Sequence, residues 1–334
     1  MKSTFIDSEL EAALDRDGYV VIPFLDQDEV QALADAYEVI GKAPGDPERA
    51  CISTFHTYDA DYKQKITDVI HGVFGPHLEA AFDDQRVLPA NYLTKWPGGM
   101  SGFGLHQDLS LVDESDQRSV EVWCALTDTD HENGELWVVP GSHAWTPTIR
   151  GIHAFSSSYA GLEQRIIQHH AIPVPIKAGE AIVFNHATLH FSYPNRSDEK
   201  RLVAIVDLIP NTATHVHYFG DGQGNVDIYE IAEAFWVENS PFTLHEPPPG
   251  AQKIGVVEDF TPVSVTDEDL DRLVAEGKAV YHEDPSRKGA LNAGRAWCHR
   301  CGTTEMDGSP NRWSGNVTML CDACKAAEPV LASA

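Results

Sequence analysis

The sequence predicts an α+β chain in which helices lead into a double-sheet β core such as a jelly roll. Residues 8–41 and 62–74 carry apolar side chains at helical spacing. Residues 86–210 instead carry short β-rich runs punctuated by Gly, Pro, Asn and Asp, a density of strands typical of two packed sheets. With 334 residues, 42% of them hydrophobic, the chain is long enough for one large domain with a sizeable core and a small additional module.

The N-terminal part predicts two helices around a short strand, followed by a third helix. We expect Ser8 to cap the first helix, with Glu11 completing a capping box, and Gly18 to end it. The elements expected after it are the strand 19–23 and the helices 27–40 and 62–74.

The β-rich part predicts six strands. They cover residues 87–94, 120–126, 136–139, 172–176, 181–184 and 202–209. Residues 211–245, which follow, are rich in aromatic side chains, and this pattern is compatible with a lid or helix over a site and with ordinary core packing.

The chain is strongly acidic, with 51 Asp and Glu against 24 Lys and Arg and a formal net charge of −27. A surface of this sign repels phosphate backbones, which argues against general nucleic-acid binding. It is typical of a well-solvated surface, and it would also steer a cationic substrate. The first residues lack the basic and apolar regions of a signal peptide, and no apolar run is long enough to span a bilayer, so we expect a cytoplasmic protein.

The best candidate for a metal site begins with His106 and Asp108. A His-x-Asp triplet alone is weak, because a chain with 16 histidines contains several by chance. This one follows the glycine-rich stretch 98–104 at the entrance to a β-rich region, and residues i and i+2 of a strand point to the same face. His190 follows a later strand-like run, and two imidazoles with one carboxylate are typical of non-haem Fe(II) oxygenases.

An anchor for a carboxylate is expected at Arg201, at the head of the run 202–209. A planar guanidinium binds a carboxylate through two parallel hydrogen bonds. Such an anchor suits a dicarboxylate 2-oxo acid, which would take two of the three iron positions left open by the protein and leave one for dioxygen.

The chain resembles the phytanoyl-CoA dioxygenase family of Fe(II)- and 2-oxoglutarate-dependent oxygenases, over roughly residues 10–215. The stretches that carry the resemblance are Leu105-His106-Gln107-Asp108, residues 133–143 (NGELWVVPGSH), and residues 189–197 (LHFSYPNRS) with Arg201 after them. The resemblance implies a double-stranded β-helix, a variant of the jelly roll, with iron held by His106, Asp108 and His190. The co-substrate contacts that it implies are Arg201, Ser192, Asn91 and Lys95. His186 is a rival third ligand, but only His190 has a serine and an arginine at the offsets of the family.

The resemblance also bears on the reaction. Related halogenases carry a small residue where this chain has Asp108, so hydroxylation, desaturation or ring closure is implied, with O2 as oxidant and succinate and CO2 as co-products. His143 is expected to be structural. The substrate itself is not readable beyond a small molecule, and the residues proposed for its pocket are His56, Tyr58, Met100, Phe103, His217 and Trp236.

Four cysteines near the C-terminus predict a second metal site. They are Cys298, Cys301, Cys321 and Cys324. Two Cys-x-x-Cys pairs at this separation are typical of a tetrahedral Zn(II) site, and zinc would stabilise a module that has little core of its own. The stretch resembles a GATA-type zinc finger, but its middle spacing is longer and no basic tail follows it, so we expect a structural or protein-contact role rather than DNA binding. Cys51 and Cys124 are expected to be buried thiols.

The predicted organisation has three parts: a dioxygenase domain over 1–250, a linker over 251–290 with a short helix capped by Thr266, and a zinc module over 291–334. The leading hypothesis is an oxygenase that oxidises an unactivated C–H bond of a small molecule. The alternatives are a nucleic-acid- or chromatin-directed oxygenase targeted by the zinc module, and a non-catalytic β-helix binding protein with a structural metal. The zinc module could also mediate a protein contact or an oligomer.

Overall fold

The computed structural model describes residues 2–41, 51–97, 101–146, 148–151, 155, 157–239 and 246–282. The helices are α1 (Ser8–Asp17), α2 (Gln27–Ile40), α3 (Ala60–Ala81), α4 (Glu163–His169), α5 (Phe235–Glu238) and α6 (Asp267–Ala275), with 3-10 turns at Thr54–His56 and Ser142–Ala144. The strands are β1 (Tyr19–Pro23), β2 (Cys51–Ser53), β3 (Gln85–Val87), β4 (Asn91–Lys95), β5 (Phe103–His106), β6 (Val120–Ala125), β7 (Leu136–Val138), β8 (Ile172–Val174), β9 (Glu180–Asn185), β10 (His190–Ser192), β11 (Arg201–Pro210), β12 (Val216–Gly220), β13 (Val226–Glu230) and β14 (Gln252–Val257).

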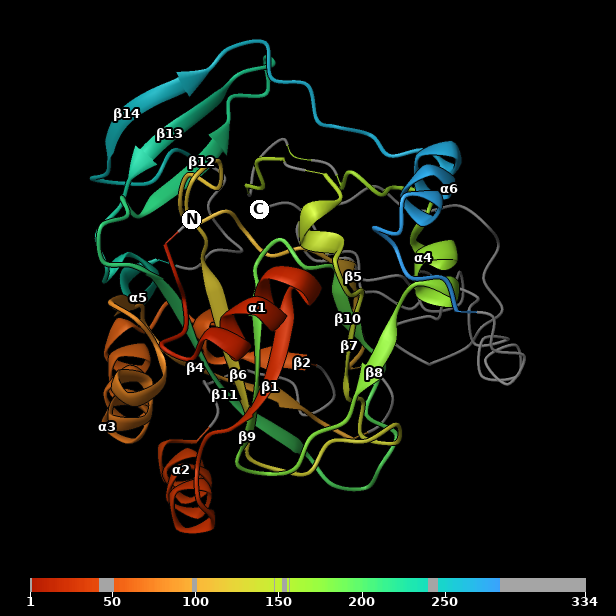
Figure 1. Ribbon diagram of the computed structural model, residues 1–334. Helices are drawn as coiled ribbons and strands as arrows, with labels where there is room; N and C mark the ends of the chain where they lie inside the picture. The colour runs from red at the N-terminus through yellow and green to blue at the C-terminus, as the bar shows by residue number, and fades with distance from the viewer. Residues whose placement is uncertain are drawn as a thin grey trace, which may run out of the picture.

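Two antiparallel sheets form the centre of the molecule (Figure 1). The larger sheet has the order β1-β9-β6-β11-β4-β2, with β3 also paired to β11, and the smaller sheet has the order β5-β10-β7-β8. Buried side chains from both sheets, among them Trp123, Leu136, Ile182 and Val203, pack into one cluster between them. This arrangement confirms the predicted double-sheet core with flanking helices.

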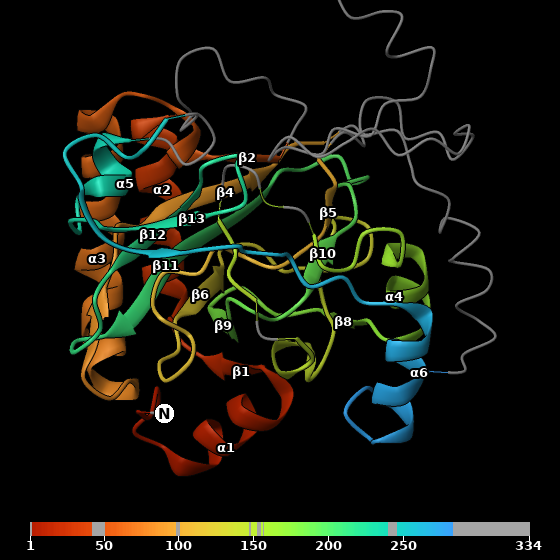
Figure 2. The ribbon, with the colours of Figure 1, turned by 90° about the horizontal axis from the view of Figure 1, so that it is seen from above.

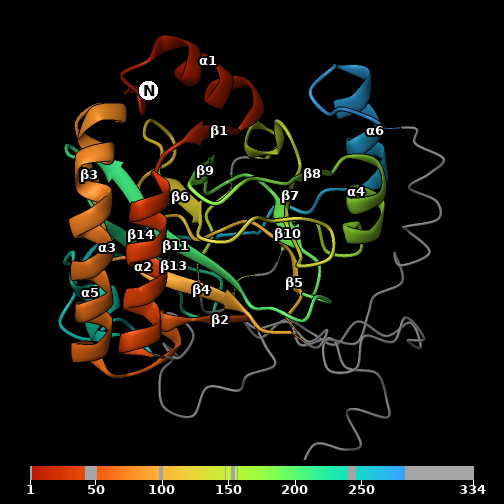
Figure 3. The same cartoon turned by 90° about the horizontal axis from the view of Figure 1, so that it is seen from below.

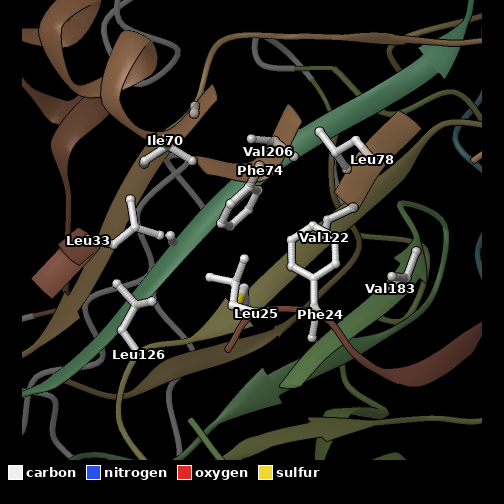
Figure 4. Packing of buried hydrophobic residues seen from close by; sticks show 14 of the residues in the cluster. Phe24, Leu25, Leu33, Ile70, Phe74, Leu78, Val122, Leu126, Val183 and Val206 are labelled. Carbon is white, nitrogen blue, oxygen red and sulfur yellow. The ribbon is translucent and has the colours of Figure 1, made fainter. Parts of the chain in front are cut away.

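Helices α2 and α3 cover the outer face of the larger sheet (Figure 3). Figure 4 shows the contact, in which Leu33 and Phe74 of the helices meet Val122 and Val206 of the sheet. Successive residues of a strand point to opposite faces. The residues next to Val122 on β6 and next to Val206 on β11 therefore point into the space between the two sheets. This alternation directs Trp123 and Ala125 of β6, and Val203 and Ile205 of β11, towards the interior.

The N-terminal helix corrects one detail of the prediction. The N-cap of α1 is Asp7, not Ser8, and its carboxylate accepts hydrogen bonds from the backbone N–H groups of Glu9 and Leu10. Glu11 does not close a capping box on Ser8, because its carboxylate accepts from the N–H groups of Thr4 and Phe5 instead. The helix ends at Gly18 as expected, where a positive φ of 78° favours glycine.

Two further predictions differ from the structure in extent. Helix α3 is longer than the expected 62–74 and contains Pro76. The expected strand 87–94 is divided into β3 and β4, which both pair with β11. Residues 211–239 form strands β12 and β13 and the short helix α5, so this part combines a small sheet with a helix.

The segment predicted as a linker is folded onto the rest of the chain up to His282, where the described part ends. Strand β14 pairs with β13, and Leu270 and Leu273 of α6 are buried in a cluster with Trp145. Helices α4 and α6 lie side by side (Figure 2), and Arg165 of α4 forms ion pairs with Asp267 and Asp271. Residues 252–282 thus supply a strand and the expected short helix to the fold. Thr266 caps α6 as expected.

The predicted zinc module lies outside the described residues, so the four cysteines keep the status of a prediction. Within the described part of the chain, no helix combines the length and apolar character needed to cross a bilayer.

Candidate metal and co-substrate site

The two histidines of the predicted metal site lie opposite each other on neighbouring strands. His106 ends β5 and His190 begins β10, and the antiparallel register pairs them directly. Their ring centroids are 4.1 Å apart. The smaller sheet thus brings together two residues that are far apart in the sequence.

Backbone carbonyls fix the tautomer of both rings. His106 Nδ1 lies 2.8 Å from the carbonyl oxygen of Gly104, and His190 Nδ1 lies 3.0 Å from that of Thr188. Since a carbonyl can only accept, each neutral ring carries its proton on Nδ1. The lone pair of each Nε2 is therefore available to a metal ion, which is the arrangement commonly found in histidine ligands.

Asp108 completes the group, although it does not lie on a strand. We expected His106 and Asp108 to share one strand face, and this expectation is wrong because β5 ends at His106. The N–H of Asp108 donates to the carbonyl of His186 at 2.9 Å, so the segment after β5 is tied to the residues that precede β10. Asp108 Oδ1 lies 3.5 Å from His106 Nε2, and Oδ2 lies 3.7 Å from His190 Nε2.

The donor set fits a metal ion. One ligand atom each from His106, Asp108 and His190 lie within 4.8 Å of one another. Asp108 Oδ2 is buried and has no hydrogen-bond partner, which is costly unless a cation satisfies it. Two imidazoles and one carboxylate on one side of an ion are typical of non-haem Fe(II) sites with open positions.

The electrostatics keep this donor set in its metal-binding form. Burial raises the pKa of the Asp108 carboxyl, but His190 and His106 lower it by more, so the pKa lies below its usual range. Burial and the neighbouring His106 lower the pKa of His190 to about 4. At neutral pH the site therefore offers a carboxylate and a neutral imidazole, as metal binding requires.

The rival histidine, His186, lies behind Asp108 in a polar group of its own. Its Nδ1 is 2.7 Å from Ser119 Oγ and its Nε2 is 3.1 Å from Asp207 Oδ1. Asp108, Glu121 and His186 also have ligand atoms within 4.8 Å of one another. This second group contains only one imidazole, so the set with His190 matches the predicted ligands better. Glu121 did not emerge from the sequence reasoning.

The predicted carboxylate anchor lies within the larger sheet. Arg201 and Lys95 are opposite each other on β11 and β4, and their exposed fractions are 1% and 0%. Arg201 donates to the carbonyl of Gly134 and Lys95 donates to the carbonyl of Tyr193. Burial lowers the pKa of Arg201 to about 10, and burial together with Arg201 holds the pKa of Lys95 well below its usual value.

These two cations fit an incoming carboxylate. Both side chains donate to main-chain carbonyls, and Arg201 Nε is buried without a hydrogen-bond partner. Two buried cations side by side are costly unless an anion compensates them. A dicarboxylate co-substrate would supply that anion.

Trp123 is a further residue of this region that the sequence reasoning missed. The Arg201 guanidinium carbon lies 5.0 Å from the centre of the Trp123 ring, a distance typical of a cation–π contact. Strand parity places Trp123 on the same face as Glu121, so the sequence carried no clear signal that this face is interior. Asn91 and Ser192 are both buried, and Asn91 Oδ1 accepts from Ser53 Oγ at 2.9 Å.

The residues predicted for a substrate pocket lie in different surroundings. The Phe103 ring contacts His106 at 4.6 Å between centroids, and His217 contacts Trp236 at 5.6 Å. The side chain of Tyr58 is 68% exposed, which does not suit an enclosed wall. Burial lowers the pKa of His56 to about 4. Met100 lies outside the described residues, as do Cys298, Cys301, Cys321 and Cys324.

The remaining predicted residues have structural surroundings. His143 Nε2 lies 3.1 Å from the carbonyl oxygen of Asp15, so the contact joins the turn after β7 to α1. Cys124 is buried, and Cys51 is partly buried; both are free thiols.

Comparisons with known proteins agree on one family. A sequence profile described as phytanoyl-CoA dioxygenase (PhyH) matches residues 14–203. Phytanoyl-CoA dioxygenase domain-containing protein 1 of Danio rerio is 32% identical over 123 residues, which cover 35% of this chain and 42% of the relative. The phytanoyl-CoA dioxygenase of Arabidopsis thaliana is 32% identical over 120 residues, which cover 34% and 41%. The chain thus spans less than half of the length of these curated relatives.

Two solved structures from nogalamycin biosynthesis are also similar. The non-haem α-ketoglutarate-dependent carbocyclase SnoK is 21% identical with a TM-score of 0.48, and the match covers 64% of this chain and 90% of SnoK. The epimerase SnoN in complex with Fe3+, α-ketoglutarate and nogalamycin RO is 21% identical with a TM-score of 0.48, covering 75% and 96%.

Proposed function

The chain belongs to the phytanoyl-CoA dioxygenase family, and on that premise we propose that it is an Fe(II)- and 2-oxoglutarate-dependent dioxygenase. Its substrate is a small molecule with an unactivated C–H bond. The observation that carries the proposal is the convergence of His106, Asp108 and His190, with both Nδ1 atoms at carbonyl oxygens and Asp108 Oδ2 buried without a hydrogen-bond partner. The other hypotheses, a nucleic-acid-directed oxygenase and a non-catalytic binding protein, receive no comparable support, and a net charge of −27 opposes the first.

In this proposal iron supplies the activation of dioxygen, which couples oxidation of the substrate to conversion of 2-oxoglutarate into succinate and CO2. The protein supplies the ligands and the geometry. His106 and His190 present Nε2 lone pairs, and Asp108 presents a carboxylate whose charge favours a divalent cation. The carbonyl contacts at Nδ1 hold both rings in the orientation that the metal needs.

Arg201 and Lys95 bind the distal carboxylate of 2-oxoglutarate in this proposal, with Ser192 and Asn91 as neighbouring polar groups. An ion pair formed in a buried place is strong only if its partners are already oriented. The Arg201 guanidinium has that orientation, because it donates to Gly134 and lies over Trp123. Phe103, next to His106, and the pair His217 and Trp236 are the proposed substrate contacts.

Turnover of 2-oxoglutarate tests the proposal directly. The full chain, loaded with Fe(II), should release succinate from 2-oxoglutarate slowly without substrate and faster with the correct substrate in a screen. His106→Ala should abolish both rates, whereas Arg165→Gln, at a surface ion pair, should leave them unchanged. Succinate release that is equal in wild type and His106→Ala would contradict the proposed function.

We further propose that the four C-terminal cysteines bind one structural Zn(II) and that the protein acts in the cytoplasm. Total metal analysis of the full chain should give about one zinc per chain, since four thiolates form one tetrahedral site. Cys298→Ser with Cys301→Ser should remove the zinc and leave the iron affinity intact. Zinc content unaffected by the double substitution would contradict this assignment.

A further inference from the structure

Asp108 raises a structural question, because it lies outside a strand while His106 and His190 lie on β5 and β10. A ligand in a connecting segment needs other contacts to fix its direction. In this protein two hydrogen bonds to the main chain of Asp108 fix that direction. The N–H of Asp108 donates to the His186 carbonyl at 2.9 Å, and the Asp108 carbonyl oxygen accepts from Arg150 Nε at 2.6 Å.

Arg150 is itself held on several sides. Its two terminal nitrogens donate to the two carboxylate oxygens of Glu114 at 2.7 and 2.6 Å, in the parallel arrangement of a bidentate pair. Its main chain exchanges hydrogen bonds with Ser110, at 3.2 Å to Ser110 Oγ and at 3.1 Å from the Ser110 N–H. The side chains of Arg150 and Glu114 are 10% and 23% exposed, so water competes little for these bonds.

We propose that Arg150 and Glu114 form a positioning pair for the metal ligand Asp108. Arg150 holds the main-chain oxygen of Asp108, and Glu114 holds the guanidinium in the plane that makes this possible. The inference rests on the proposed function, since it concerns the residue assigned there as an iron ligand. Neither residue belongs to the ligand set or to the stretches that identify the family.

The contact acts through geometry rather than through charge. Arg150 Nε donates to the main-chain oxygen, whereas the metal would bind the carboxylate on the side chain. Rotation of this peptide unit would redirect the Asp108 side chain away from His106 and His190. Loss of such supporting contacts typically weakens metal binding by about 10- to 100-fold.

The guanidinium is suited to this task and an ammonium is not. Nε and the two terminal nitrogens form a planar fork that addresses Asp108 and Glu114 at the same time. Lysine keeps the positive charge but offers one nitrogen without a fixed plane. Arg150→Lys therefore keeps the positive charge but removes the planar group that holds Asp108, so it distinguishes a geometric role from an electrostatic one.

The test is the affinity of the full chain for Co(II), measured anaerobically by titration of its visible absorption. Arg150→Gln, Arg150→Lys and Glu114→Gln should each weaken Co(II) binding by about 10- to 100-fold. At saturating Co(II), the affinity for 2-oxoglutarate should change much less, because Arg201 and Lys95 are untouched. Arg165→Gln is the matched control, because Arg165 forms ion pairs with two carboxylates, Asp267 and Asp271, at the surface, and this variant should bind Co(II) as wild type does.

The outcomes are distinguishable. Wild-type affinity in both Arg150→Gln and Glu114→Gln, or full rescue by Arg150→Lys, would overturn the positioning role. Failure of the wild type itself to bind Co(II) would instead overturn the proposed function. Glu114→Gln preserves size and removes one charge at a partly exposed position, so it keeps the test decisive if Arg150→Gln does not fold. In the double variant, Co(II) affinity should be no weaker than in Arg150→Gln alone, because both residues act as one unit.

Discussion

The proposed metal ligands His106 and His190 lie on the smaller sheet and Asp108 lies in the segment after β5, whereas Arg201 and Lys95 lie opposite each other at the ends of β11 and β4 in the larger sheet. The side chains of His106 and Asp108 are 14% and 25% exposed, while the two cations are almost completely buried. The sheet ladder therefore holds the cations, and hydrogen bonds from connecting segments hold Asp108. Substitutions within the sheet should change co-substrate binding, and substitutions in the segments should change metal binding.

The largest effect is expected from Arg201→Ala. Removing one partner of a buried, hydrogen-bonded charge pair costs about 2–5 kcal/mol, so the affinity for 2-oxoglutarate should fall by about 30-fold or more. Co(II) affinity should stay within about twofold of wild type, because Arg201 lies outside the ligand set. Isothermal titration of Co(II)-loaded and metal-free protein measures both quantities. A parallel loss of metal affinity would show that the two regions are not independent.

A smaller effect is expected from Lys95→Met, which should lower the affinity for 2-oxoglutarate but raise the stability of the protein without it. The affinity for 2-oxoglutarate should fall by about 10-fold, because one of two cations is lost. The free energy of unfolding without co-substrate should rise by about 1 kcal/mol, since an apolar side chain avoids the cost of burying an ammonium group beside Arg201. Chemical denaturation with and without 2-oxoglutarate checks both signs. Destabilisation in the absence of co-substrate would mean that Lys95 is satisfied by the protein alone.

Lys63 provides a third buried cation for comparison, and its expected effect is the smallest. Its ammonium donates to the carbonyls of Trp236 and Asn239 at 3.0 and 2.9 Å, so it holds α5 against α3. Burial lowers the pKa of Lys63 to about 8. Between this value and the usual pKa near 10.5, the unfolded chain binds more protons than the folded one, so stability should rise with pH.

Lys63→Met should remove this rise. The difference in the free energy of unfolding between wild type and Lys63→Met should change in favour of wild type by about 1 kcal/mol between about pH 7 and about pH 10. Denaturant titrations at the two pH values measure it. A constant difference across this range would contradict the lowered pKa.

Much of this molecule follows from its sequence, because local signals specify local structure. Short β-rich runs bounded by Gly, Pro, Asn and Asp predicted β6 and β11, and helical spacing predicted α2. The family stretches named His106, His190 and Arg201, which the structure places at strand ends where side chains face the interior. The end of α1 was also predictable, because Gly18 readily adopts the positive φ that ends a helix.

Other features could not be predicted, since they depend on contacts between distant segments. The departure of Asp108 from strand β5 is set by the carbonyl of His186, and its support by Arg150 joins residues 42 positions apart. The docking of α6 depends on Arg165 and on Leu270, which no periodic pattern connects. Trp123 could not be assigned to the interior either, because strand parity groups it with the acidic Glu121.

The most direct test of the account is the visible spectrum of the full chain with Fe(II) and 2-oxoglutarate under anaerobic conditions. We expect a weak metal-to-ligand charge-transfer band in wild type, no band in His106→Ala, and a band in Arg201→Ala only at far higher 2-oxoglutarate concentration. This pattern would place the metal and the co-substrate carboxylate at the two regions compared above. Absence of the band in well-folded wild type would contradict the joint binding of iron and 2-oxoglutarate at this site.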